Sequence, residues 1–346
     1  MRHCYFHFHR KIRFSLCLAL FLIGLGIFCA AVCNCADSDT WIAQFLTEDQ
    51  QTSPDAVHNS DSAIGQTSIT DADTAFDAFL SKLFRQEASA NLLNLHYTLE
   101  NPSAYGITEY QASLGSYTSD SPKKAAAFAE NILTTLLQFD SENLSSENQL
   151  TLDILNDHLT QAKAGADFYC YDEPLTPTTG LQSQIPILLA EYTFHNQQDI
   201  SDYLELLTDI PRYFSQICAY EEEKAAAGRF MPSYTARTIV DQCHDFTSNP
   251  KQHYLVTTFN QKSAALTDLS KNEQLAYQEQ NQAILEQEVF PAFNLLTDTL
   301  EKLSDRTINE AGLCHFPEGT KYYEYLVQDC TGSSDSIDSL KKRTAN

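Results

Sequence analysis

At 346 residues, with 43% hydrophobic and 11% aromatic side chains, the chain can bury a large core and is too apolar to be disordered or fibrous. Acidic residues outnumber basic ones by 46 to 22, and four of the basic residues precede residue 14. An acidic excess of this size repels phosphate backbones, so we exclude nucleic acid as a partner.

Residues 1–36 have the order of an export or anchoring segment. The basic stretch 10–13 precedes the uncharged run 14–33, which is about as long as a bilayer-spanning helix. Positive charge before the run keeps its start in the cytoplasm, so the remainder is expected to be extracytoplasmic, either secreted or anchored in the cell membrane. Three alternatives stay open: a cleaved signal peptide, an uncleaved membrane anchor, and a lipoprotein signal that uses one of three nearby cysteines.

Residues 37–70 are rich in Ser, Asp, Thr and Gln, which cannot bury enough apolar surface to order the segment. We expect a flexible polar linker there. The helical domain is predicted to occupy 71–346. Its first helix is indicated by large apolar residues at the i, i+3, i+4, i+7, i+8 spacing, which share one helical face: Phe76, Phe79, Leu80, Leu83 and Phe84.

Further helices are indicated by start and stop signals. A Ser-Pro start at Ser121 and a capping-box pattern at Ser146–Gln149 begin two of them. Prolines predict an irregular loop over 166–185. Four more helices follow. The first runs from about Asp199 to Gly228 with a kink at Pro211, and the second covers Ser233–Phe246. The third and longest runs from the capping box Ser270–Glu273 to about Leu303 with a bend at Pro291, and the last runs from Tyr322 to Gly332.

No strand-like alternation of useful length occurs, and no repeat of fixed period. The predicted fold is therefore all-α, a multi-helix bundle of long amphipathic helices.

Motifs for chemistry are sparse. None of the ten histidines is followed by Glu, so no His-Glu-x-x-His zinc motif exists, and no Gly-x-Ser-x-Gly or phosphate-binding glycine loop occurs. The charge run Tyr220–Lys224 is expected to be a solvated helix end. Five cysteines follow residue 36 without a Cys-x-x-Cys pair, and Cys314 with Cys330 is the pair we would examine for a disulfide. We therefore predict no catalytic or metal-binding residue in this chain.

Several segments in this order resemble one known family: Leu95–Pro102, Tyr105–Tyr110, Tyr171–Pro174, Leu188–Tyr192, Ile210–Tyr213, Glu221–Lys224 and Gly312–Gly319 with Tyr322 and Tyr323. The chain is similar, from about Asp71 to its end, to the bacterial domain of unknown function 885 family. The resemblance implies an all-helical fold like that of zinc carboxypeptidases. In complete members the zinc site is carried by a His-Glu segment and a Pro-Gly-His segment in the C-terminal half, and this chain has neither. Tyr322 and Tyr323 match a position near the last loops before that half, so we consider them candidate cleft-lining residues.

The resemblance leads to three hypotheses. The first is the exported, N-terminal, non-catalytic half of a metallopeptidase-like protein, inactive by itself and without zinc of its own. The second is an extracytoplasmic helical module that binds peptides or serves as a scaffold. The third is one half of a split peptidase whose partner chain carries the catalytic half. If the domain is incomplete, the apolar faces of 76–84 and 285–303 should be partly uncovered and its stability marginal.

Overall fold

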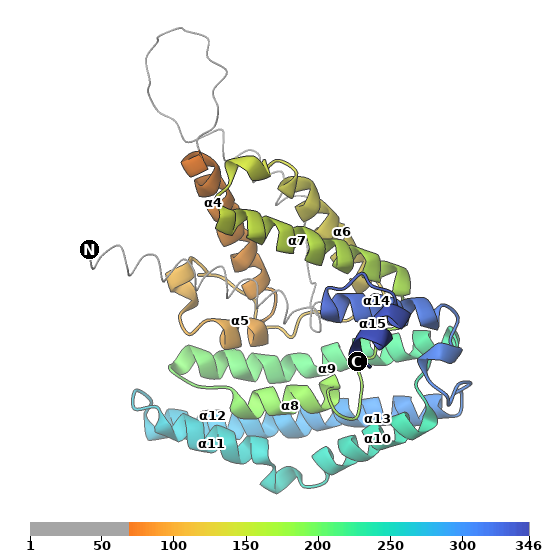
Figure 1. The fold of residues 1–346 in the computed structure, drawn as a ribbon. Coiled ribbons are helices and arrows are strands. Elements are labelled where there is room, and N and C mark those ends of the chain that lie inside the picture. The colour runs from red at the N-terminus through yellow and green to blue at the C-terminus, as the bar shows by residue number, and fades with distance from the viewer. Residues whose placement is uncertain (1–68, 346) are drawn as a thin grey trace, which may run out of the picture.

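The computed structural model describes residues 69–345, and within them regular structure consists of helices without any strand (Figure 1). The all-α prediction is confirmed. The apolar N-terminal run and almost all of the predicted linker lie outside the described residues. Within residues 69–345, no helix combines the length and apolar character needed to cross a membrane.

The helices vary in length from two turns to eight. Their bounds are α4 Ile69–Ala88, α5 Leu92–Thr98, α6 Ser121–Leu136, α7 Ser146–Gly165, α8 Leu181–Glu191, α9 Gln197–Ala226, α10 Ser233–Thr247, α11 Tyr254–Ala265, α12 Lys271–Ile284, α13 Phe290–Ser304, α14 Gly319–Thr331 and α15 Ile337–Thr344. Short 3₁₀ turns occur at Pro102–Tyr105, Ser141–Asn143, Ala166–Phe168, Pro250–Gln252 and Leu313–His315.

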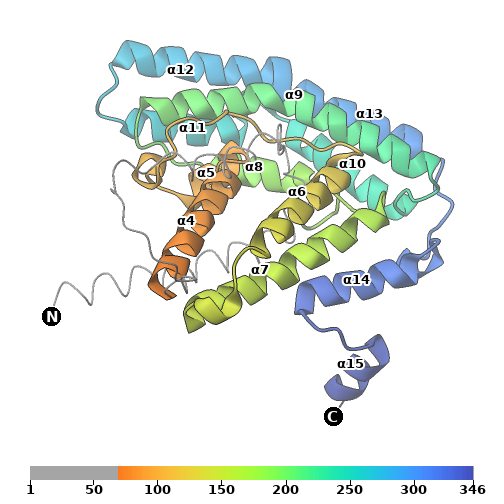
Figure 2. The ribbon, with the colours of Figure 1, turned by 90° about the horizontal axis from the view of Figure 1, so that it is seen from above.

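The helices form two groups, which Figures 1 and 2 show from the side and from above. In the larger group α9 packs on α12 and α13, while α10 packs on α13 and α11 on α12 and α8. In the smaller group α6 lies along α7, with α4 beside them. Helix α14 packs against α7, and α15 projects beyond it (Figure 2). The candidate site lies in this smaller group.

Helix α9, the longest α-helix, is fixed at its start by a reciprocal cap. The Asn196 side chain accepts from the N–H of Asp199, and the Asp199 carboxylate accepts from the N–H of Asn196. Its apolar face enters the core, where the rings of Phe214 and Phe293 lie 4.9 Å apart. Phe246 of α10 stacks on Phe293 at 4.1 Å, which ties α9, α10 and α13 together.

The run from Lys271 to Ser304 is helical throughout, and the capping box at Ser270 is confirmed. Its irregularity is a π-helical turn, Leu285–Val289, in which the Phe290 N–H donates to the Leu285 carbonyl. Pro291 follows immediately and has no N–H to donate. The wider turn before it accommodates the break in the hydrogen-bond ladder, as π-bulges do elsewhere.

Three local predictions are wrong in detail. The side chain that caps α7 is Ser145, which accepts from the Asn148 N–H, so the cap lies one residue before the predicted Ser146. The predicted loop over 166–185 ends sooner, because α8 begins at Leu181. Helices α5, α8 and α11 were not predicted. Helix α5 has only two turns, α8 contains Pro186, and α11 is only weakly amphipathic.

The expectation of uncovered apolar faces is also wrong. Phe76 and Phe79 are fully buried, and Phe139 covers them with ring centroids at 5.0 and 5.5 Å. The inward-facing side chains of the second face are buried too, because α9 and α10 pack over α13: Leu285, Val289, Phe293, Leu296, Leu300 and Leu303. These faces therefore need no second half to cover them, and they no longer support a prediction of marginal stability.

Candidate functional site

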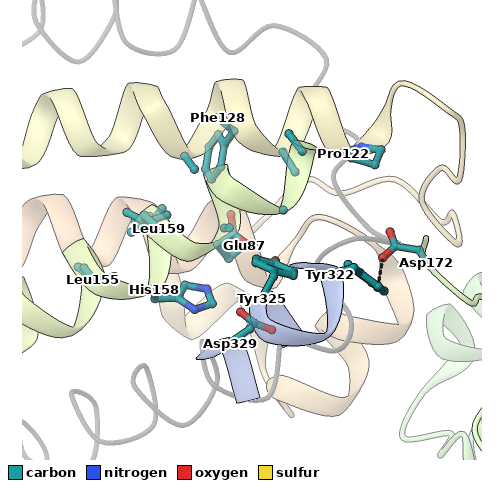
Figure 3. A pocket seen from close by; sticks show the side chains of 16 residues that line it. Glu87, Pro122, Phe128, Leu155, His158, Leu159, Asp172, Tyr322, Tyr325 and Asp329 are labelled. Atoms are coloured by element: carbon teal, nitrogen blue, oxygen red, sulfur yellow. Dashed lines mark hydrogen bonds between the residues drawn. The ribbon is translucent and has the colours of Figure 1, made fainter. Parts of the chain in front are cut away.

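A cavity of about 100 Å³ lies where α4, α6, α7 and α14 meet, and we call it the α4–α14 cavity (Figure 3). A water molecule needs roughly 10–15 Å³ of such space, so the cavity holds several waters or one small organic group. Its lining combines apolar side chains with three carboxyl groups, one imidazole and two tyrosine rings. None of the described residues that line it is Lys or Arg.

Helical periodicity supplies the apolar walls. Leu83 on α4 and Phe128 on α6 face the cavity, as do Leu155 and Leu159, which are four residues apart on α7. All four are buried members of the main hydrophobic core. The cavity is therefore continuous with the core, and a charge inside it is poorly solvated.

Glu87 follows Leu83 by four residues, so its carboxyl group is on the same face of α4. The side chain is 7% exposed, and in Figure 3 it is seen between Phe128 and Tyr325. No side chain or backbone group among residues 69–345 forms a hydrogen bond or ion pair with this carboxyl group. Burial raises the pKa of Glu87 from its ordinary value of 4.5 to about 7.

His158 of α7 and Asp329 of α14 provide a second polar pair in the lining (Figure 3). Burial lowers the pKa of His158, and the nearby Asp329 opposes that change. Burial likewise raises the pKa of Asp329, against the opposing effect of His158. Both groups are thus shifted toward their neutral forms by loss of water, and each partly restores the charge of the other.

Aromatic rings form the wall contributed by α14. The Tyr322 hydroxyl donates to Asp172 Oδ1 at 3.3 Å, and its ring lies 5.0 Å from that of Tyr171. The Tyr325 ring lies 5.2 Å from that of Phe168, which follows the end of α7. These contacts attach α14 to α7 and to the loop after it, so α14 is held as one wall of the cavity.

Gly165 allows this approach of α14. A methyl group at this position would lie 2.5 Å from the Tyr325 hydroxyl and 3.1 Å from its Cζ, although the backbone itself is helical. Alanine favours a helix by about 1 kcal/mol over glycine, so without the ring Gly165→Ala would be stabilising. With the ring in place, we expect overpacking to destabilise the protein by about 1–3 kcal/mol in denaturant unfolding.

The control for Gly165→Ala is the same change in a Tyr325→Phe background, which removes the nearest atom. The loss of stability should be smaller there, in a double-mutant cycle. An equal loss in both backgrounds would show that the Tyr325 hydroxyl is not the atom that limits this position.

A buried ammonium group fixes the loop that contributes Asp172. Lys224, near the end of α9, is fully buried, and its Nζ donates to the Asp172 carbonyl at 2.8 Å and to Glu173 Oε2 at 2.7 Å. Burial by itself would lower the pKa of Lys224, but Glu221, Glu173 and Asp172 together raise it above its ordinary value. Lys224 therefore stays charged and holds the loop against α9.

Glu221 lies one turn before Lys224 and is also fully buried. Its Oε1 is 3.7 Å from Lys224 Nζ, beyond hydrogen-bond distance, and both carboxylate oxygens lack a hydrogen-bond partner among the described residues. Burial raises the pKa of Glu221 to about 7, against the effect of Lys224. The buried hydroxyls of Tyr171 and Tyr220 likewise have no hydrogen-bond partner in the described part of the chain. The expectation that 220–224 is a solvated helix end is wrong for Glu221 and Lys224, which are fully buried, with the loop after α7 packed on Lys224. It holds for Glu222 and Glu223, which are exposed.

The residues singled out from the sequence occupy different places. Tyr322 lines the α4–α14 cavity, whereas Tyr323 is half exposed and does not line it. Cys314 and Cys330 are both free and exposed, so the disulfide considered for them is not formed in the structure.

Four residues had no functional role predicted from the sequence: Glu87, His158, Asp329 and Lys224. The position of Glu87 carried a signal, because a carboxylate four residues after Leu83 interrupts an otherwise apolar helix face. For the other three residues, local sequence spacing supplied no such signal. Their partners lie far away in the chain, as with Lys224 and Glu173, which are 51 positions apart.

A zinc ion, which the family resemblance implies for complete members, does not fit the residues described here. Glu87, His158, Asp172 and Asp329 line one cavity, yet among residues 69–345 no three His, Cys, Asp or Glu side chains come together closely enough to hold a metal ion. We therefore assign no metal-dependent step to these side chains.

The fold is similar to that in the crystal structure of "the putative lipoprotein from Colwellia psychrerythraea", with a TM-score of 0.64 and 18% sequence identity. The similarity covers 80% of this chain and 48% of that protein, so the chain spans about half the length of that protein. At this identity the likeness concerns the fold alone.

No curated protein matches the chain in sequence. Residues 100–345 match the family described as "Bacterial protein of unknown function (DUF885)". Because the match includes most of the chain, together with α14 and most of the cavity lining, the chain belongs to this DUF885 family.

Proposed function

We propose that the chain is a non-catalytic, ligand-binding half of an extracytoplasmic, metallopeptidase-like protein, and that the α4–α14 cavity is its binding site. The observation that carries the proposal is Glu87, which lines a cavity continuous with the core and whose carboxyl group has no hydrogen-bond or ion-pair partner among residues 69–345. A buried polar group normally has a partner, so a ligand or ordered water is expected beside it.

Three further observations support the remainder of the proposal. The basic stretch and apolar run at the N-terminus are typical of exported proteins, and the Colwellia protein of similar fold is described as a "putative lipoprotein". That protein is about twice as long as the part similar to this chain, which is consistent with a second half. The metallopeptidase-like character depends on the sequence resemblance.

The binding site can be tested with a panel of small neutral, cationic and anionic organic compounds, observed by ligand-detected NMR on the purified full chain. Ala125, on the cavity side of α6, is replaced by Phe to fill the space, and exposed Ala127 on the same helix is replaced by Phe as the control. We expect bound compounds to be lost with Ala125→Phe and retained with Ala127→Phe. If no bound compound responds to Ala125→Phe, the cavity is not the binding site.

The non-catalytic part of the proposal has a separate test. The purified chain is incubated with zinc and a mixture of short peptides, and the products are examined by mass spectrometry. We expect the peptides to remain intact. Cleavage that a chelator abolishes, with one zinc bound per chain, would show that the chain has a catalytic centre of its own.

A further inference from the structure

We propose that the α4–α14 cavity selects a primary alkylammonium group, with the ammonium against the Glu87 carboxylate and the alkyl chain against the apolar walls. This inference rests on the proposed binding function and adds the chemical class of the ligand. It follows from three features of the cavity taken together: its charge, its unpartnered carboxyl group and the shape of its apolar walls.

The charge of the lining is one-sided. Three carboxyl groups, those of Glu87, Asp172 and Asp329, face the same space, and none of the lining residues is Lys or Arg. Asp172 accepts from Tyr322, and Asp329 has His158 near it, so both have some compensation. Glu87 has no such group, and a bound cation would supply it.

Glu87 also explains why the ligand should donate hydrogen bonds. An ammonium group carries three N–H donors, and its bonds to a carboxylate are about twice as strong as bonds between neutral groups. A carboxylate ligand is disfavoured here by repulsion from the three acidic side chains. A neutral alkyl alcohol would fit the space, but it would bring no charge to compensate Glu87.

The remaining walls suit a short alkyl chain and a cation. Leu83, Phe128 and Leu159 line the cavity together with Glu87 and provide apolar surface. Tyr325 lines it too, and aromatic rings attract positive charge. The cavity of about 100 Å³ is smaller than an engineered cavity of about 150 Å³ that binds benzene. A four-carbon chain is therefore a suitable probe. Such a group occurs both in free alkylamines and in the side chain of a peptide lysine.

The test uses the full chain with n-butylammonium and its neutral isostere butan-1-ol, by isothermal titration at pH 8. Glu87→Gln keeps the shape and removes the charge. Exposed Glu324→Gln, on α14 but outside the cavity, is the matched control. We expect Glu87→Gln to weaken n-butylammonium binding at least tenfold, which is about 1.4 kcal/mol, and Glu324→Gln to leave it unchanged.

The pH dependence gives a readout that a purely structural role of Glu87 would not produce. A bound ammonium favours the ionised carboxylate, so affinity should rise as the pH passes through about 7, the pKa to which burial raises Glu87. The other titratable groups facing the cavity are His158, Asp172, Tyr322, Tyr325 and Asp329. These five groups are unchanged in the Glu87→Gln variant. The variant should therefore lose the rise in n-butylammonium affinity near pH 7 and keep any pH dependence of affinity that the five groups cause.

The outcomes separate this inference from the proposed function. Butan-1-ol binding as tightly as n-butylammonium, with both abolished by Ala125→Phe, would overturn the selection of a cation and leave the binding site intact. If neither probe binds and no compound in the wider panel binds, both the selection of a cation and the proposed binding function are overturned. A blocked pentapeptide with one lysine, compared with its norleucine counterpart, separates the sources: lysine-dependent binding identifies a peptide side chain, and binding of n-butylammonium alone identifies a free amine.

Discussion

Replacement of Lys224 by Met is expected to destabilise the protein by about 3–5 kcal/mol at pH 8, because it leaves the buried Glu221 carboxylate and the partly exposed Glu173 carboxylate without their cation. Glu221 and Glu173 both form ion pairs with the Lys224 ammonium, at 3.7 and 2.7 Å. Methionine preserves most of the side-chain volume, so the loss comes from charge rather than from a void. Denaturant unfolding at fixed pH measures it.

The loss should depend on pH in a definite direction. The pKa of Lys224 is raised, so its contribution is fully present below its ordinary value of 10.5 and disappears only at higher pH. Lowering the pH protonates Glu173 and Glu221, whose pKa values burial already raises, and neutral carboxyl groups need no cation. The effect of Lys224→Met should therefore be smaller at pH 5 than at pH 8.

Two variants provide controls for Lys224→Met. Lys321→Met makes the same change at a side chain that is 70% exposed, where the pair with Glu318 contributes little, so stability should stay within about 0.5 kcal/mol. Glu221→Gln in the Lys224→Met background should recover part of the loss. A loss that is equal at pH 5 and pH 8 and insensitive to Glu221→Gln would show that packing, not charge, makes Lys224 important.

The second large effect is expected for Glu87→Gln without ligand. The folded-state pKa of about 7 exceeds the ordinary value of 4.5, so between these values the folded state binds more protons than the unfolded state. Stability contributed by Glu87 is thus present below pH 4.5 and is lost as the pH rises toward 7. The shift corresponds to roughly 3 kcal/mol. We expect Glu87→Gln to be more stable than wild type by about that amount at pH 8, and about equal at pH 4.

The measurement is the difference in unfolding free energy between variant and wild type at several pH values. The difference is needed because the pKa of Glu221 is also raised, so Glu221 makes the unfolding free energy depend on pH in a similar way in both proteins. Glu324→Gln should show no pH-dependent difference. A variant that is equally or less stable at pH 8 would indicate that the Glu87 carboxylate is already compensated in the folded protein.

Local sequence determined most of the long helices and several of their ends. Ser270 and Glu273 form the predicted capping box, and Gly332 ends α14 in the left-handed conformation that glycine adopts readily. The spacing of Phe76, Phe79 and Leu83 correctly identified the buried face of α4. These features depend on residues within about one turn of each other, so a linear sequence contains them.

Tertiary structure alone decided the burial of charge. Five charged or tyrosine residues in a row, 220–224, are typical of a solvated helix end, yet Glu221 and Lys224 are fully enclosed. Whether a charge is buried depends on which distant segments cover it, and for Lys224 these include a loop about 50 positions earlier in the chain. For the same reason Glu87 becomes a site only when α6, α7 and α14 close the space around it, since desolvation is a property of the packed assembly and not of the helix that carries the side chain.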